Sequence, residues 1–403
     1  MRPTGPDFEA ELIRGLTEAG VDVIKIGMAT TPMFYYAVHV LKAEGGIHIT
    51  ASHNPGEYNG MKMTRAEAVP IAIDSGLSEI RDLVEQRDWP EPVAVPGTVT
   101  EESVKDAYID LVTEGQSAEG LKIVIDAGNG MAGLILQEVF ERIGGEVVPL
   151  YWELDGAFPN HEANPLVEEN MRDIQAAIKE HGADLGAAFD GDGDRVFFVT
   201  ERAETVDGDV TTALIATEIL KENPGATVIY DLRSTRATRE VIEESGGHAV
   251  ITRVGHSFIK AKMREENALF AGEVSGHFYF TPWYAESGML AMMNVCRLIK
   301  ETGQPLSALI EPINGRYATS PELNFEVEDK EGVMEKIKQS FPDANEILEL
   351  DGITIRFDDW WTNVRPSGTE PLLRLKVEAT SPELLKDKRA ELEKLIGGTP
   401  VTS

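Results

Sequence analysis

The chain has 403 residues, 42% of them hydrophobic, and a formal net charge of −32 at pH 7. It is long enough for several domains of ~100–200 residues, and its acidic balance disfavours nucleic acid and anionic membranes as partners. The single cysteine, Cys296, excludes a disulfide framework and favours a cytoplasmic location, and neither a membrane-spanning apolar run nor a secretory signal is present.

Helix-like and strand-like patterns alternate along the chain. Apolar residues at helical spacing over residues 7–20 precede a strand-like run over 21–27, and a helix-like stretch over 34–46 precedes a strand over 47–54. Five later stretches show the same kind of strand, namely 121–130, 182–194, 226–235, 246–256 and 266–277. Short apolar strands that alternate with helices predict parallel sheets in α/β domains.

Three of these strands end in strongly polar loops, which begin near Ser52, Asp190 and Glu273. Their separation of about a hundred residues is a plausible domain length. We therefore predict three similar α/β domains with mixed sheets in series, followed by a smaller C-terminal α+β domain. The predicted bounds are 1–115, 116–217, 218–317 and 318–403. Because ligands bind beyond the carboxyl ends of strands, we expect the loops to meet in a central cleft.

The segment DGDGDR places the carboxylates of Asp190, Asp192 and Asp194 at alternate positions. Backbone alternation lets all three face one cation, and the glycines permit the tight curve. An EF-hand is one alternative, but Arg195 stands where that loop needs glycine. A solvated acidic turn is another, but aspartates packed between apolar strands repel one another unless a cation compensates. We predict a metal site and favour Mg²⁺, because few carboxylates are offered.

The segment RPSGTEP offers a cradle for a phosphate. Arg365 supplies a guanidinium, Ser367 and Thr369 supply hydroxyls, and Gly368 leaves backbone N–H groups accessible. A plain turn between two strands would contain similar residues, so that alternative stays open.

The segment GEVSGH places Glu273, Ser275 and His277 at alternate positions. A carboxylate, a hydroxyl and an imidazole in a row suit neutral hydroxyl groups such as those of a sugar. A zinc site is the weaker alternative, because no second histidine lies nearby in the sequence.

The segment GNGMAG, residues 128–133, follows a strand and opens a helix, as a dinucleotide-binding fingerprint does. A tight turn in any doubly wound domain needs the same glycines, and we favour that interpretation. A nucleotide-dependent oxidoreductase is therefore only an alternative function, and nicotinamide binding would reveal it.

The four loops TASHNPGEYNGMK, DGDGDR, GEVSGH and RPSGTEP, in this order and spacing, resemble those of the α-D-phosphohexomutases. They span nearly the whole chain, and GEVSGH is most similar to the phosphomannomutase/phosphoglucomutase branch. The resemblance implies reversible phosphoryl transfer between C1 and C6 of mannose or glucose phosphates, through a phosphoserine and a 1,6-bisphosphate. A phosphoglucosamine mutase is an alternative, although that branch usually carries Gln after the Glu of GEVSGH.

The resemblance also implies roles for residues around the phosphoserine. Ser52 would carry the phosphoryl group, which would face an Mg²⁺ ion held by the three aspartates of DGDGDR. Arg195 would add a positive charge to the transition state. His53, Lys62 and His256 are three candidates for proton transfer, and the sequence does not decide among them.

The remaining loops would bind the sugar phosphate in two orientations. The distal phosphate would lie on Arg365, Ser367, Gly368 and Thr369, while Arg233, Glu273, Ser275 and His277 would bind the sugar. Glucose or mannose 1,6-bisphosphate would act as activator. The expected partners are small hexose phosphates, without nucleic acid or membrane, and the expected assembly is a monomer or homodimer.

The N-terminus departs from the family pattern. Family members begin with a strand and a Tyr-Asp-Ile-Arg-Gly-like segment, whereas this chain opens with MRPTGPDF. We expect the first strands of the first domain to be missing, together with an arginine near the phosphoserine, and a sheet edge to be left open. A phosphosugar-binding protein inactivated by this truncation is therefore a further alternative.

Overall fold

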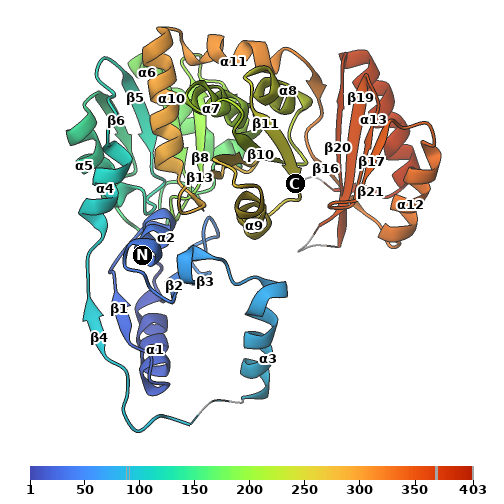
Figure 1. Ribbon diagram of the computed structural model, residues 1–403. Helices are drawn as coiled ribbons and strands as arrows, with labels where there is room; N and C mark the ends of the chain where they lie inside the picture. The colour runs from blue at the N-terminus through green and yellow to red at the C-terminus, as the bar shows by residue number, and fades with distance from the viewer. Residues whose placement is uncertain (88, 90, 368–370, 402–403) are drawn as a thin grey trace.

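The computed structural model spans residues 1–403 and describes all of them except 88, 90, 368–370 and 402–403. Four structural units follow one another along the chain (Figure 1). Unit I lies below units II and III in this view, and unit IV lies beside unit III. No helix of the described part of the chain is both long enough and apolar enough to cross a membrane.

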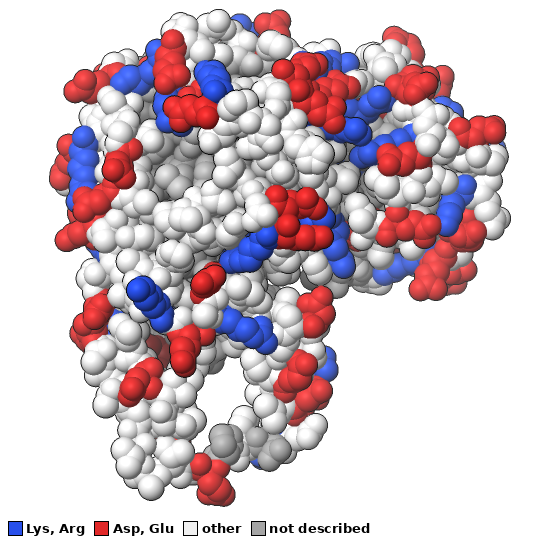
Figure 2. All heavy atoms as spheres, in the orientation of Figure 1, with Lys and Arg blue, Asp and Glu red and all other residues white. Residues whose placement is uncertain are grey.

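Unit I carries the Ser52 loop. Its elements are α1 (Gly5–Glu18), β1 (Val23–Lys25), α2 (Thr31–Val40), β2 (Gly45–Ile49), β3 (Met61–Arg65), the short turns η1 (Ala66–Ala68) and η2 (Ile73–Leu77), α3 (Ser78–Gln86) and β4 (Val99–Glu101). β1 pairs with β4 in parallel, and β2 pairs with β3 antiparallel, so this unit has two separate two-stranded sheets. Neither α1 nor α3 contains a buried residue, and Figure 2 shows an opening beside α3. Unit I is therefore less completely packed than the next two units.

Unit II is built on one mixed sheet. Its elements are α4 (Lys105–Thr113), β5 (Lys122–Asp126), α5 (Gly133–Ile143), β6 (Glu146–Leu150), η3 (Glu168–Met171), α6 (Arg172–His181), β7 (Leu185–Phe189), β8 (Val196–Thr200) and β9 (Thr205–Val206). The strand order is β6-β5-β7-β8-β9. β5 is parallel to β6 and β7, whereas β8 is antiparallel to both of its neighbours.

Unit III repeats this topology. Its elements are α7 (Gly208–Glu222), β10 (Thr227–Asp231), α8 (Arg236–Glu244), β11 (His248–Thr252), α9 (His256–Glu266), β12 (Phe270–Gly272), β13 (Phe278–Phe280), β14 (Ala285–Glu286), α10 (Gly288–Thr302) and α11 (Leu306–Asn314). The order β11-β10-β12-β13-β14 has the same parallel-to-antiparallel change after its third strand. The prediction of similar α/β domains with mixed sheets is confirmed most clearly by this pair.

Unit IV has an antiparallel sheet with helices. Its elements are β15 (Ala318–Thr319), β16 (Leu323–Glu326), α12 (Lys330–Ser340), β17 (Glu346–Leu348), β18 (Ile353–Arg356), β19 (Trp360–Pro366), β20 (Leu372–Ala379), α13 (Pro382–Ile396) and β21 (Thr399–Val401). The main order is β17-β18-β19-β20-β16-β21, and β15 also pairs with β20. This sheet is the smaller α+β domain that the sequence predicts.

The hydrophobic cores explain how the units are joined. One continuous core contains side chains of both unit II and unit III, including Ile125 of β5 and Phe270 of β12. The methionines of α10 and Cys296 belong to it, so they serve packing, as their helical spacing indicates. Unit IV encloses a separate core around Trp360. Units II and III therefore form one packed body, whereas unit IV has a core of its own.

All four polar loops occupy equivalent places in the fold. Each one joins two neighbouring antiparallel strands, which are β2 and β3, β7 and β8, β12 and β13, and β19 and β20. In units II and III this is the point where the parallel part of the sheet ends. The repeated topology thus brings the loops of units II and III to equivalent places in their sheets.

Candidate active site

The Ser52 loop meets the aspartate loop directly. Ser52 Oγ lies 3.2 Å from Asp190 Oδ2 and 3.1 Å from His53 Nδ1. The backbone of Ser52 is left-handed, with φ at 51°, and its N–H donates to Thr50 Oγ1. A Cβ atom at Gly191 would lie only 2.5 Å from the Ser52 carbonyl oxygen, so glycine is needed for this approach.

Three buried carboxylates face one another beside Ser52. Asp190, Asp192 and Asp194 are at most 2% exposed, and each offers a ligand oxygen within 4.8 Å of the others. Within the described chain, Asp192 Oδ1 and Asp194 Oδ1 are buried without a hydrogen-bond partner. Buried carboxylate oxygens without partners are costly, so this group could hold a metal ion, and oxygen ligands suit a hard cation.

Neighbouring elements hold the aspartates in place. The N-terminus of α2 contributes Thr31, whose hydroxyl donates to Asp192 Oδ2 at 2.6 Å. The GNGMAG turn lies on the other side, where Met131 N donates to the carbonyl of Gly191 at 3.0 Å. The glycine-rich turn therefore supports the aspartate loop, in keeping with the interpretation as a tight βα turn.

Lys62 places a positive charge directly against two of the three aspartates. Its Nζ lies 2.9 Å from Asp192 Oδ2 and 2.5 Å from Asp194 Oδ2. Burial alone would lower the pKa of Lys62, but Asp192 and Asp194 raise this pKa well above its usual value. Lys62 therefore stays protonated, and it is placed to compensate charge rather than to accept a proton.

The carboxyl groups of Asp190 and Asp194 have pKa values shifted in opposite directions. Burial, together with the carboxylates of Asp194 and Asp192, raises the pKa of Asp190 well above its usual range. Burial also disfavours ionised Asp194, yet Lys62 and His277 hold the pKa of Asp194 well below its usual range. Such repulsion within one small group is what a bound cation relieves.

The GEVSGH loop joins the site through Arg195. Arg195 Nε lies 3.7 Å from Asp190 Oδ2 and donates to His277 Nε2 at 3.2 Å. His277 Nδ1 faces Ser275 Oγ at 3.1 Å, and Ser275 donates to Glu273 Oε2 at 2.9 Å. An isolated backbone bridge between Arg195 and His277 fastens the two loops. The predicted residues of units II and III are therefore in contact.

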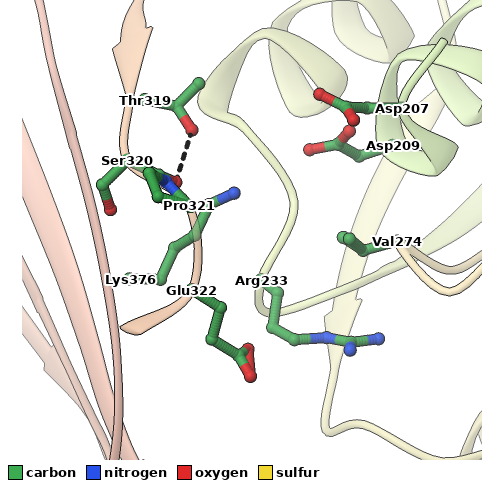
Figure 3. Close-up of a pocket in the computed structure, with 9 residues that line it drawn as sticks. All are labelled: Asp207, Asp209, Arg233, Val274, Thr319, Ser320, Pro321, Glu322 and Lys376. Atoms are coloured by element: carbon green, nitrogen blue, oxygen red, sulfur yellow. Dashed lines mark hydrogen bonds between the residues drawn. The ribbon is translucent and has the colours of Figure 1, made fainter. Parts of the chain in front are cut away.

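Arg233 lines a cavity of about 340 Å³ between units III and IV. Figure 3 shows Arg233 and Asp209 on the unit III side, and Glu322 and Lys376 on the unit IV side. Arg233 pairs with Asp231 at 2.7 Å and lies 3.6 Å from Glu273 Oε2. The cavity thus lies next to the predicted sugar-binding loop.

Glu322 pairs with the predicted phosphate-binding arginine. Arg365 Nη2 donates to both carboxylate oxygens of Glu322, at 3.0 and 3.1 Å. Arg374 lies 3.3 Å from the same carboxylate and donates to Ser367 Oγ at 3.2 Å. The Glu322 carboxylate is therefore paired with the Arg365 guanidinium, which the sequence analysis assigns to binding a phosphate. The predicted Gly368 and Thr369 lie outside the described residues.

The three candidates for proton transfer are placed differently. His53 and Lys62 lie at the Ser52 loop, and burial followed by the charge of Arg195 lowers the pKa of His53 to about 4. His256 begins α9, and its Nδ1 lies 3.7 Å from the buried carboxylate of Glu286. The structure thus brings two of the three candidates beside Ser52.

An arginine that the sequence analysis missed lies under the Ser52 loop. Arg2 is 5% exposed and donates to the carbonyl oxygens of Ser52 and Pro55, each at 2.6 Å. Its guanidinium also lies 5.2 Å from the ring centroid of Phe158. A positive charge is therefore present near Ser52, although we expected such an arginine to be missing. No local pattern around MRPTGPDF indicates this role.

Known proteins match the whole chain. Four sequence families account for residues 1–91, 105–204, 207–317 and 322–395, and they are described as phosphoglucomutase/phosphomannomutase alpha/beta/alpha domains I, II and III and the C-terminal domain. The chain belongs to the phosphoglucomutase/phosphomannomutase family. The fold and the resemblance inferred from the four loops are thereby confirmed, and the chain is a phosphohexomutase homologue of the isomerase class.

Individual relatives agree with this family. A protein named phosphohexose mutases from Xanthomonas campestris pv. campestris (strain B100) is 39% identical, covering 99% of this chain and 90% of its own length. A phosphomannomutase/phosphoglucomutase of Pseudomonas putida is 37% identical, covering 98% and 84%. The crystal structure of a phosphoglucomutase/phosphomannomutase family protein from Burkholderia thailandensis superposes with a TM-score of 0.89 at 33% identity, covering 99% and 89%.

Proposed function

We propose that this protein interconverts hexose 1-phosphates and hexose 6-phosphates of glucose and mannose through a phosphorylated Ser52. The observation that carries this proposal is the position of Ser52 Oγ, 3.2 Å from Asp190 in a group of three buried carboxylates. Phosphoryl transfer is the kind of reaction that needs a hydroxyl beside a group of carboxylates that could hold a cation, with positively charged side chains such as Lys62 and Arg195 close by.

The first half-reaction moves the phosphoryl group from Ser52 to the free hydroxyl of the sugar phosphate. The bond between phosphorus and Ser52 Oγ breaks and a bond to the sugar oxygen forms. The sugar hydroxyl gives its proton to a nearby base, and the released Ser52 Oγ takes up a proton. The resulting 1,6-bisphosphate turns in the cleft and returns its other phosphoryl group to Ser52. Lys62 and Arg195 offset the charge that spreads over the phosphoryl oxygens during both transfers.

We propose Mg²⁺ as the metal that the three aspartates hold. The oxygens Asp192 Oδ1 and Asp194 Oδ1 accept no hydrogen bond within the described chain, although His277 Nε2 lies 3.3 Å from Asp194 Oδ1, and they fit an oxygen-binding cation. When bound, Mg²⁺ would neutralise negative charge on a phosphoryl group attached to Ser52. Lys62 occupies the other oxygens, Oδ2, so it and a cation would not compete for the same atoms.

The second phosphate of the substrate would bind at unit IV. Arg365 and Ser367 would contact it, and Glu322 would have to give up its pair with Arg365. Arg233, Glu273, Ser275 and His277 would bind the sugar hydroxyls from unit III. Glucose or mannose 1,6-bisphosphate as activator, a cytoplasmic location and a monomer or homodimer remain predictions of this proposal.

A mutase assay on the Ser52→Ala variant tests the proposal. Wild-type protein with Mg²⁺ and catalytic 1,6-bisphosphate should convert glucose 1-phosphate and mannose 1-phosphate, whereas Ser52→Ala should show no turnover. Ser117→Ala, at an exposed serine whose hydroxyl accepts a bond from Lys300, is the matched control. Full turnover by Ser52→Ala would refute the proposal. Sugar phosphate binding without turnover in the wild type would instead favour an inactive binding protein.

A further inference from the structure

A second cluster of buried charges lies where units I and III meet. Lys260 of α9 and Glu286 of β14 are 0% and 1% exposed, and Lys260 Nζ lies 2.6 Å from Glu286 Oε2. The ammonium group also lies 3.5 Å from the ring centroid of Tyr35, on α2 of unit I. The phosphoryl transfer proposed above uses none of these three residues.

Keeping this ion pair out of water is costly. Removing two ions from water costs several kcal/mol for each ion, and apolar residues of similar volume are often at least as stable. Burial lowers the pKa of Lys260 to about 8, although Glu286 opposes this shift. Packing alone therefore gives no reason for a lysine and a glutamate at these two positions, which leaves room for a role beyond stability.

Glu286 also faces His256. Its Oε1 lies 3.7 Å from Nδ1 of His256, whereas its Oε2 lies against Lys260. Nδ1 is buried and has no hydrogen-bond partner in the described chain, yet 44% of the His256 side chain is exposed. The exposed part therefore includes the opposite edge of the ring, which carries Nε2.

Nearby positive charges act on the His256 ring. Burial, followed by the charges of Lys260, Lys62 and His277, lowers the pKa of His256 to about 3. The ring is therefore neutral at pH 7, and only one of its nitrogens carries a proton. A carboxylate beside Nδ1 favours the proton on Nδ1, which leaves the lone pair on Nε2.

We infer that Glu286 is a positioning residue for His256, and that Lys260 keeps its carboxylate in place. Glu286 holds the imidazole with its proton on Nδ1, so that Nε2 is presented as a hydrogen-bond acceptor for a substrate hydroxyl. The gap of 3.7 Å closes to hydrogen-bonding distance when substrate binds, as is common for such contacts. This inference rests on the proposed function, because the hydroxyl belongs to the sugar phosphate.

The tautomer of His256 tests this inference without any assay of activity. Long-range ¹H–¹⁵N correlation spectra of the full chain distinguish a protonated Nδ1 from a protonated Nε2, and loss of the signals in His256→Gln assigns them. We expect a protonated Nδ1 in the wild type and a changed tautomer distribution in Glu286→Gln. A protonated Nε2 in the wild type would overturn the inference, even if the protein proved not to be a mutase.

Kinetics separate positioning from stability. Glu286→Gln should lower kcat/KM by about 10- to 100-fold, the size of a hydrogen bond to a charged group. The double variant Lys260→Met/Glu286→Leu should regain thermal stability but not turnover, because it replaces the pair with apolar groups. Wild-type kcat/KM in either variant would overturn the inference.

A matched control is available in the same unit. Glu218 of α7 is 5% exposed and pairs with Lys221 at 2.7 Å and with Arg297 at 3.3 Å, neither of which belongs to the active-site loops. Glu218→Gln should reduce thermal stability without changing the His256 tautomer or kcat/KM. An equal loss of kcat/KM in Glu218→Gln would show that any buried carboxylate of unit III has this effect, and would overturn the specific role of Glu286.

Discussion

Replacing Lys62 with methionine should destabilise the protein chiefly in the absence of metal. Methionine keeps the length of the side chain but removes the ammonium group that contacts Asp192 and Asp194 at 2.9 and 2.5 Å. Removing one partner of a buried ion pair costs about 3–5 kcal/mol. Because the Lys62 side chain is 21% exposed, we expect the lower end, about 3 kcal/mol. For a chain of 403 residues this is a fall of about 3–4 °C in the melting midpoint.

The assay is thermal unfolding in EDTA and in Mg²⁺, with Lys25→Met as the control. Lys25 pairs with Glu9 and Glu101 at 3.3 and 3.8 Å near the surface, so its loss should cost at most about 1 kcal/mol. Mg²⁺ at a hundred times its Kd should stabilise Lys62→Met by about 2.7 kcal/mol, because the ion binds the folded carboxylates. The wild type should gain less at the same Mg²⁺ concentration, because the Lys62 ammonium group repels the ion and weakens its binding. An unchanged midpoint of Lys62→Met in EDTA would refute the reasoning.

Two further predictions concern pH and phosphate. Burial lowers the pKa of His161, but its 3.0 Å pair with Asp126 outweighs burial and the net pKa is raised. The pair therefore stabilises the fold fully below pH ~6.5, and this stabilisation is lost as the pH rises through the pKa of His161 in the folded state. In urea unfolding, the free energy of unfolding of the wild type should fall between pH 6 and pH 8 by an amount that His161→Gln does not show. Glu322→Gln removes the carboxylate that pairs with Arg365. Inorganic phosphate should therefore bind the variant several-fold more tightly than the wild type in a competition assay. Weaker binding would mean that Glu322 orients Arg365 for the phosphate instead of competing with it.

Local patterns in the sequence predict most of the fold and the centre of the site. DGDGDR carries all three aspartates within one short loop, so their convergence follows from backbone alternation between β7 and β8. Ser52 follows a strand in the same way. The contact between Ser52 and Asp190 joins residues far apart in the sequence, and only the resemblance of all four loops to one family predicts it.

Other features depend on contacts that leave no local mark. Arg2 reaches Ser52 and Pro55 across sequence separations of 50 and 53 residues, and its neighbours form only a helix N-terminus. The pair between Glu322 and Arg365 joins the start of unit IV to its central hairpin. The division of unit I into two small sheets depends on which strands find partners, and the strand patterns alone do not contain that information.

The distribution of charge gives the site its character. Figure 2 shows acidic side chains spread over the face in view, as the net charge of −32 requires. Among the described residues, however, only three Lys or Arg residues are buried, and these are Arg2, Lys260 and Arg365. Arg2 contacts the Ser52 loop, Arg365 belongs to the RPSGTEP loop, and Lys260 pairs with Glu286 next to His256. Burying a cation is costly, and the rest of the surface repels anions, so the binding energy for a phosphorylated sugar must come from short-range contacts within the cleft. Substrate affinity should therefore depend far more on Arg365, the buried cation proposed to contact a phosphate, than on the ionic strength of the solution.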